Sequence, residues 1–253
     1  IEWADDVWNP VTGCDRISPG CDNCYALTMA RRLKGMGQAK YQNDGDPRTS
    51  GPGFGVTAHP DALRLPYRWR TPRRVFVNSM SDLFHAKVPL DFIRRVFEVI
   101  AGTPQHTYLV LTKRSARLRK IADRLDWPPN LWMGVSAEDQ ERAYQRIPAL
   151  LATPAAVRWV SAEPLLGPLD LSPYLAGGLS WVVVGGESGP GARPMHPEWA
   201  RALRDQCTAA KVPLFFKQAG AVLAREWGCS DPKGHTPAEW PESFPREFPA
   251  DVA

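Results

Sequence analysis

Three cysteine thiols stand close together near the start of the 253-residue chain. Six residues separate Cys14 from Cys21, and two separate Cys21 from Cys24, in a stretch rich in Gly and Pro. Thiolates in such a loop bind zinc or an iron–sulfur cluster, and both prefer four ligands. Because only three thiols are local, either a distant residue supplies the fourth ligand, or one iron of a cubane cluster stays open to an exogenous ligand.

Two other interpretations of these cysteines remain open. A structural zinc ion would be completed by Cys229, Cys207 or a histidine such as His85, since a C-x2-C pair commonly joins a distant ligand. The three thiols could instead be unligated core residues, which a Gly/Pro loop disfavours. Cys207 shares a helical face with Trp199 and Leu203, so we expect it in the core. Five cysteines without a secretory signal indicate reduced thiols rather than a disulfide framework.

The elements that must position the cysteines alternate between strands and helices. Short, nearly continuous apolar runs are typical of strands covered on both faces, and apolar residues at helical spacing lie between them. We expect Asp91 and Ser115 to be the N-caps of two of these helices. The alternation predicts an α/β domain with a parallel sheet. The expected strands are residues 75–79, 108–112, 131–136, 157–161, 181–185 and 214–217.

Polar residues follow nearly every expected strand. Because the carboxyl ends of parallel strands converge on one mouth in a barrel, this distribution predicts a full or partial (β/α) barrel. An open sheet would concentrate such residues at a single switch point. We expect the barrel to span residues 1–220, with an irregular basic insertion at 34–74. A Pro-rich extension at 221–253 should wrap on the domain or be partly disordered.

Several of these segments together resemble a known family. They are WNPVTGC (8–14), CDNCY (21–25), NSMSDLF (78–84), LTKR (111–114), GVS (134–136), SAEPL (161–165) and GGESG (185–189). They cover most of the chain and resemble the phage Gp37/Gp68 family of radical S-adenosylmethionine (SAM)-like proteins. More distantly, the chain is similar to the radical SAM superfamily and its DNA-repair branch, spore photoproduct lyase.

The resemblance implies a partial barrel of the radical SAM type with a [4Fe-4S] cluster after the first strand. Cys14, Cys21 and Cys24 would ligate the cluster, and SAM would bind the open iron. An external flavodoxin- or ferredoxin-like electron donor would reduce the cluster. SAM would then be cleaved to a 5′-deoxyadenosyl radical that abstracts hydrogen from a substrate. The usual superfamily spacing is C-x3-C-x2-C, whereas the first gap here has six residues and the aromatic Tyr25 follows the last cysteine.

The same resemblance implies roles for polar residues at the other strand ends. The segment 79–82 lies where the superfamily holds the SAM amino group, and Lys113 would pair with the SAM carboxylate. Ser136 and Glu138 lie where ribose hydroxyls are held. Each of these residues could instead cap a loop or form a solvated salt bridge. The cofactor-binding candidates are Ser79, Ser81, Asp82, Lys113, Ser136, Glu138, Glu163 and Glu187, and the catalytic candidates are His85, His196 and Tyr25.

A cluster of arginines lies at the end of the expected insertion. The chain has 23 Arg, 8 Lys and a net charge of +4, with a pI of about 8.9, which permits a nucleic-acid partner without requiring one. Arginines interleaved with aromatic residues suit a phosphate backbone and stacked bases. An ordinary solvated face is the alternative. The nucleic-acid candidates are Arg64, Arg68, Trp69, Arg70, Arg73 and Arg74.

Two classes of function follow from these patterns. The first is a radical SAM enzyme, acting on nucleic acid in repair or modification, or else on a protein or small molecule. The second is a non-catalytic nucleic-acid-binding protein stabilised by zinc or a cluster. The longest apolar runs are strand-length and far below the ~20 residues that span a bilayer. We therefore expect no membrane association and a cytoplasmic location.

Overall fold

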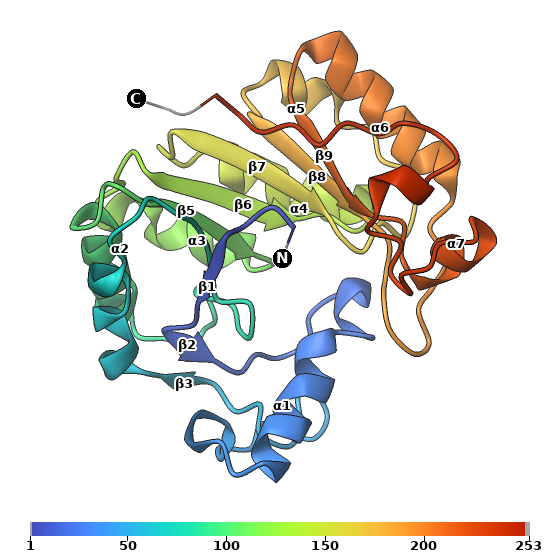
Figure 1. Ribbon diagram of the computed structural model, residues 1–253. Helices are drawn as coiled ribbons and strands as arrows, with labels where there is room; N and C mark the ends of the chain where they lie inside the picture. The colour runs from blue at the N-terminus through green and yellow to red at the C-terminus, as the bar shows by residue number, and fades with distance from the viewer. Residues whose placement is uncertain (1, 251–253) are drawn as a thin grey trace.

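A computed structural model describes residues 2–250 as a curled sheet with helices on its convex face (Figure 1). Seven parallel strands form this sheet in the order β1-β4-β5-β6-β7-β8-β9, and β2 and β3, which lie between β1 and β4 in the chain, form a separate antiparallel pair. The predicted partial barrel is confirmed as a half-barrel. The strands are β1 (Asp6–Trp8), β2 (Val11–Thr12), β3 (Thr57–Ala58), β4 (Arg74–Val77), β5 (Thr107–Thr112), β6 (Leu131–Ser136), β7 (Val157–Ala162), β8 (Trp181–Gly185) and β9 (Leu214–Gln218).

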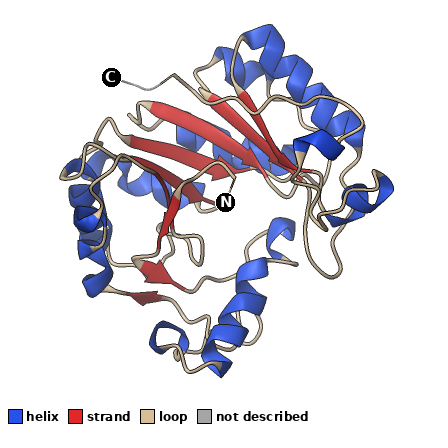
Figure 2. Ribbon diagram, viewed as in Figure 1, coloured by secondary structure: helices blue, strands red, loops and turns tan. Residues whose placement is uncertain are grey.

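Most of the helices lie between successive strands of the half-barrel, and the last one follows β9 (Figure 2). No helix within residues 2–250 is long and apolar enough to cross a membrane. The predicted N-caps Asp91 and Ser115 are wrong by one or two positions, because Pro89 and Arg114 already occupy the cap positions. Asp91 instead lies in the first turn. The helices are α1 (Tyr25–Gly35), α2 (Leu90–Ala101), α3 (Ser115–Ile121), α4 (Gln140–Leu151), α5 (Ser172–Ala176), α6 (Pro197–Ala210) and α7 (Ala221–Glu226).

Aromatic side chains fill the amino-terminal half of the half-barrel's interior. The convex face of the sheet packs on the helices, while alternate residues of the strands form a second cluster on the concave face. In this cluster Trp3 contacts Trp159 and Trp181 edge-on. Gly134 is required here, since a Cβ would lie 2.4 Å from the Trp159 ring. A ligand of this half-barrel must therefore approach from the carboxyl ends of the strands.

The Pro-rich extension covers the open edge of β9. The Phe216 N–H donates to the Pro245 carbonyl at 2.9 Å, and the Glu247 N–H donates to the Leu214 carbonyl at the same distance. Phe244 is buried and stacks on Phe216, with ring centroids 4.2 Å apart. These contacts protect a strand edge that would otherwise offer unpaired backbone groups to another chain.

Candidate functional site

The three cysteines lie in a loop, residues 13–24, that crosses the carboxyl ends of the strands. We call it the cysteine loop. At its start the Gly13 N–H donates to the Met80 carbonyl at 2.9 Å, which ties the loop to the end of β4. Gly13 has φ +85°, and a Cβ there would lie 2.3 Å from the Gly55 carbonyl oxygen, so only glycine fits. At its end Cys24 is the N-cap of α1.

The three thiols are partly buried and free of disulfide bonds. Burial raises the pKa of Cys14 to about 12, and it also raises the pKa of Cys24. The nearby Cys21 thiol adds a smaller increase to both pKa values. Arg114 opposes the increase at Cys14, because its Nη2 lies 3.7 Å from the Cys14 Sγ. A cation thus stands beside the thiol that burial makes hardest to ionise.

No fourth cysteine or free histidine adjoins the cysteine loop in the described residues. Cys207, in α6, is 1% exposed and packs in the core, as predicted, and the Cys229 thiol faces the Glu239 carbonyl in the C-terminal extension. His85 has both ring nitrogens engaged: Nε2 lies 3.0 Å from Asp15 Oδ2, and Nδ1 accepts the Lys87 N–H. Within residues 2–250, no three His, Cys, Asp or Glu side chains surround a single metal-ion position.

Glu138, at the end of β6, holds the first half of the cysteine loop. Its side chain is fully buried, accepts the Ser18 hydroxyl at 2.6 Å, and pairs with Arg146 at 2.8 Å and with Lys113 at 3.4 Å. Gly20 lies so near that a Cβ there would be 2.3 Å from the Glu138 Cγ. Burial would raise the pKa of Glu138, but the Lys113 and Arg146 charges lower it overall. The carboxylate is therefore ionised and braces the loop.

Glu187, after β8, holds the second half of the loop. It accepts the Asn23 side-chain amide at 2.9 Å and pairs with Arg193 at 2.6 Å. Arg193 in turn donates to the Pro19 carbonyl at 2.8 Å. Burial alone would raise the pKa of Glu187, but hydrogen bonds from Arg193 and Asn23 lower it. The sequence analysis missed Ser18, Asn23 and Arg193, although the position of Asn23 between two cysteines is a usable signal.

The candidate cofactor-binding residues after β4 form hydrogen bonds to other parts of the chain. Asp82 accepts the Thr112 hydroxyl at 2.7 Å and the Lys113 N–H at 3.0 Å, which joins the ends of β4 and β5. Ser81 donates to the Val11 carbonyl at 2.8 Å, and the Tyr25 hydroxyl donates to the Ser79 carbonyl at 2.5 Å. These contacts hold the strand ends at the mouth in place. For Ser81 and Asp82 they favour the alternative interpretation, in which these residues cap loops.

The remaining candidates lie at other points of the mouth. Glu163 pairs with Lys217 of β9 at 2.9 Å, and this pairing raises the pKa of Lys217 even though burial alone would lower it. Ser136 is 1% exposed at the end of β6. His196, at the start of α6, is exposed and lies against the Trp199 ring. His196 therefore does not join the cysteine loop in any contact between described residues.

The predicted arginine strip lies at the opposite end of the strands. Arg73 and Arg74 immediately precede or begin β4 and pair with Asp6 and Asp5 beside the amino end of β1. The Arg73 guanidinium also stands over the Trp69 ring, 5.5 Å from its centroid. The members that are exposed without these pairings are Arg64, Arg68 and Arg70. The strip therefore lies away from the mouth, and its contact with nucleic acid stays a prediction.

Comparisons with known proteins give one match. A family model described as "Protein of unknown function (DUF5131)" matches residues 1–239, which is nearly the whole chain. No curated protein and no solved structure matches the chain. The geometry of the mouth, rather than a characterised relative, must therefore supply the argument for function.

Proposed function

We propose that the chain, which belongs to the DUF5131 family, is a radical SAM enzyme whose [4Fe-4S] cluster is held by Cys14, Cys21 and Cys24. One observation carries the proposal: a single loop at the mouth of a half-barrel gathers three thiols and has no fourth protein ligand beside it in residues 2–250. Such a site would leave one iron open to SAM.

The donor set suits a cluster better than a zinc ion. Zinc holds each sulfur at about 2.3 Å, so its thiolates crowd around one point, and structural zinc takes four protein ligands. A cubane spreads its thiolates over separate irons. Three local thiols without a fourth protein ligand beside them in residues 2–250 match the three protein-bound irons of such a cubane better than the four protein ligands of structural zinc. Lys113 and Arg114 lie where their charges would offset the negative charge of a thiolate-bound cluster.

When bound, the cluster would supply the electron that cleaves SAM into methionine and a 5′-deoxyadenosyl radical. The chain's own residues position and enclose this chemistry. Glu138 and Glu187 hold the cysteine loop from β6 and β8, on the strands across the sheet from β1. Lys113 would exchange part of its pairing with Glu138 for the SAM carboxylate. The concave aromatic cluster closes the amino-terminal half of the interior and so limits access of water to the radical.

The test is to purify the protein anaerobically and measure its iron and sulfide. The reduced protein is then mixed with SAM, and 5′-deoxyadenosine is measured by mass spectrometry. We expect about four irons per chain, as a cubane requires, together with deoxyadenosine. Both should be lost in Cys21→Ala.

The matched control is Cys229→Ala, which removes a partly buried thiol far from the cysteine loop and should keep both iron and activity. Stoichiometric zinc in place of iron would overturn the proposal, and so would an intact cluster that never cleaves SAM. Stoichiometric zinc would favour the binding protein without catalysis.

A further inference from the structure

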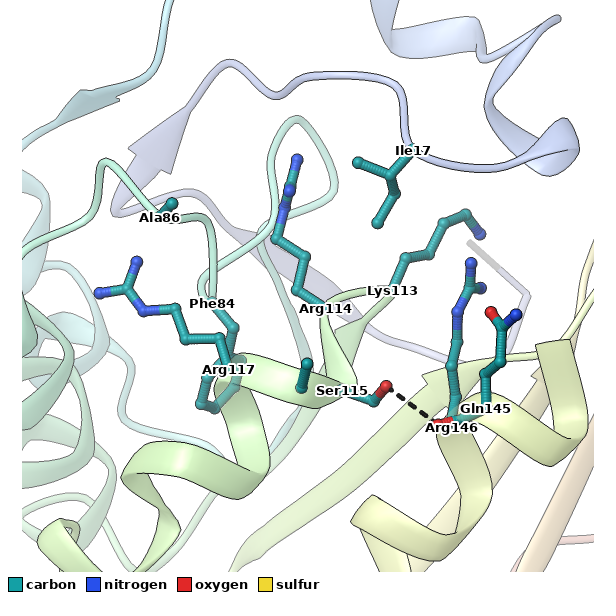
Figure 3. A pocket seen from close by; sticks show the side chains of 10 residues that line it. Ile17, Phe84, Ala86, Lys113, Arg114, Ser115, Arg117, Gln145 and Arg146 are labelled. Atoms are coloured by element: carbon teal, nitrogen blue, oxygen red, sulfur yellow. Dashed lines mark hydrogen bonds between the residues drawn. The ribbon is translucent and has the colours of Figure 1, made fainter.

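A cavity lies beside the cysteine loop, on the rim of the mouth (Figure 3). Its volume is about 500 Å³, within the range of small-molecule sites, about 300–1,000 Å³. Three parts of the chain build it: Ile17 of the cysteine loop, the loop between β4 and α2, and the start of α3 with the facing side of α4. We call it the rim pocket. Its lining includes Lys113, Arg114, Arg117, Gln145 and Arg146, with Phe84, Ala86 and Ala116 as apolar wall.

The charges that line the rim pocket are all positive. Four cationic side chains and no carboxylate belong to its lining. Two of the cations share an anion behind the wall, since Lys113 and Arg146 both pair with the buried Glu138. The charges of the other two, Arg114 and Arg117, are less compensated.

The positive charges of Arg114 and Arg117 are only partly compensated by neighbouring groups. Arg117 donates to the carbonyl oxygens of His85 and Val88, which are neutral. Arg114 donates to the Asp15 carbonyl and stands 3.9 Å from the nearest Asp82 oxygen, while its buried Nε has no hydrogen-bond partner. Burial lowers the pKa of Arg117 and nearby Arg114 lowers it further, against the opposite effect of Asp82. An anion between the two guanidinium groups would relieve this repulsion.

The apolar wall narrows the choice of anion. Ile17 is 44% exposed at the edge of the rim pocket, so part of its apolar surface is open to a ligand. Together with Ala86 and Ala116 it offers a surface to a flat apolar group beside the cations. A nucleotide combines a phosphate, which guanidinium groups bind through two parallel N–H donors, with a base that packs on apolar surface.

We propose that the rim pocket binds the phosphate of a nucleotide unit, with its base against the apolar wall. The unit would come from a mononucleotide or from single-stranded nucleic acid. This assignment goes beyond the cluster proposal and does not depend on it. It also moves the nucleic-acid candidate from the arginine strip at the amino ends of the strands to the rim of the mouth, where Arg114 adjoins both the rim pocket and Cys14.

The test measures binding by calorimetry with AMP, adenosine, inorganic phosphate and a short oligothymidylate. The variant is Ala116→Glu, which places a carboxylate in the lining and removes no hydrogen bond of the folded protein. A carboxylate facing a phosphate costs enough that we expect the Kd for AMP to rise about tenfold or more. Ala209→Glu, at an exposed position of α6, adds the same charge away from the rim pocket and is the matched control. We expect it to leave the Kd for AMP unchanged.

The other ligands decide what the rim pocket recognises. AMP should bind more tightly than adenosine or inorganic phosphate, and its binding should weaken with salt. If oligothymidylate competes with AMP, and Ala116→Glu abolishes this competition, the nucleotide unit comes from nucleic acid. If AMP binds and oligothymidylate does not compete with it, the ligand is a mononucleotide. Adenosine binding equal to AMP binding, or an unchanged Kd in Ala116→Glu, would overturn the inference. Cys21→Ala should still bind AMP, which separates this result from failure of the cluster proposal.

Discussion

Replacing Glu138 with Gln tests how the buried carboxylate supports the mouth. The substitution keeps the size of the side chain but removes the charge that pairs with Arg146, which is itself only 4% exposed. Removing one partner of a buried ion pair costs about 3–5 kcal/mol, because the other charge stays buried without compensation. Lys113 is 20% exposed and can turn to water, and the Ser136 carbonyl still accepts from Arg146. We therefore expect the lower end, about 3 kcal/mol.

The measurement is urea unfolding followed by fluorescence of the 10 tryptophans, with thermal unfolding as a second measure. A loss of about 3 kcal/mol lowers the Tm of a domain of this size by roughly 6–12 °C. Glu98→Gln, at an exposed position of α2, is the matched control and should change the unfolding free energy by less than about 0.5 kcal/mol.

The effect should also depend on pH in a defined direction. The folded pKa of Glu138 lies below its ordinary value of 4.5, since the Lys113 and Arg146 charges outweigh the opposing effect of burial. The stability it contributes is fully present above pH 4.5 and is lost as the pH falls through the folded pKa. The difference between Glu138→Gln and the unmodified protein should therefore shrink in acid. A loss below about 1 kcal/mol at neutral pH would refute the view that Glu138 holds the mouth together.

Three further substitutions test other contacts. Arg193→Ala removes the donor that joins Glu187 to the cysteine loop. We expect metal retention, measured after dialysis against a chelator, to fall about 10–100-fold. Arg201→Ala, on the surface, is the control and should retain metal normally. Gly134→Ala forces a Cβ into the Trp159 ring and should destabilise the fold by about 1–3 kcal/mol in urea unfolding. Phe244→Ala should cost about 3–5 kcal/mol and increase aggregation, measured by light scattering, because the extension then loosens from β9; an unchanged midpoint would mean that the extension does not stabilise the sheet.

Much of the sheet could be predicted because its strands are buried on both faces. β6 and β8 match the predicted ranges, and β4, β5, β7 and β9 differ from theirs by one or two residues at an end, whereas β1, β2 and β3 were not predicted. A parallel sheet covered by helices leaves continuous apolar runs in the sequence, which local patterns detect well. The helix starts were less accurate, since Pro89 and Arg114 carry no side-chain cap and so leave no cap signature.

The bracing of the cysteine loop could not be predicted from local pattern. Ser18 and Glu138 are 120 residues apart, and Asn23 and Glu187 are 164 apart, so that no spacing rule connects them. The arginine strip is different, because its position at the amino ends of the strands was available from the sequence. Residues that directly precede a strand lie at its amino end, whereas a barrel site lies at the carboxyl ends. Its composition indicates a nucleic-acid surface, and the order of the residues along the chain places this surface away from the mouth.

The long-range bracing also determines when the cysteine loop is completed during biosynthesis. The cysteines precede their supports, Glu138, Glu187 and Arg193, by a long stretch of chain and therefore leave the ribosome well before them. Chains fold from the amino terminus as they are made, yet this loop must wait for β8 and the turn after it. A nascent or truncated chain would expose three unsupported thiols to oxidation and to stray metal ions. Under the proposed function, loading of the cluster would therefore follow synthesis of β8 and the turn after it.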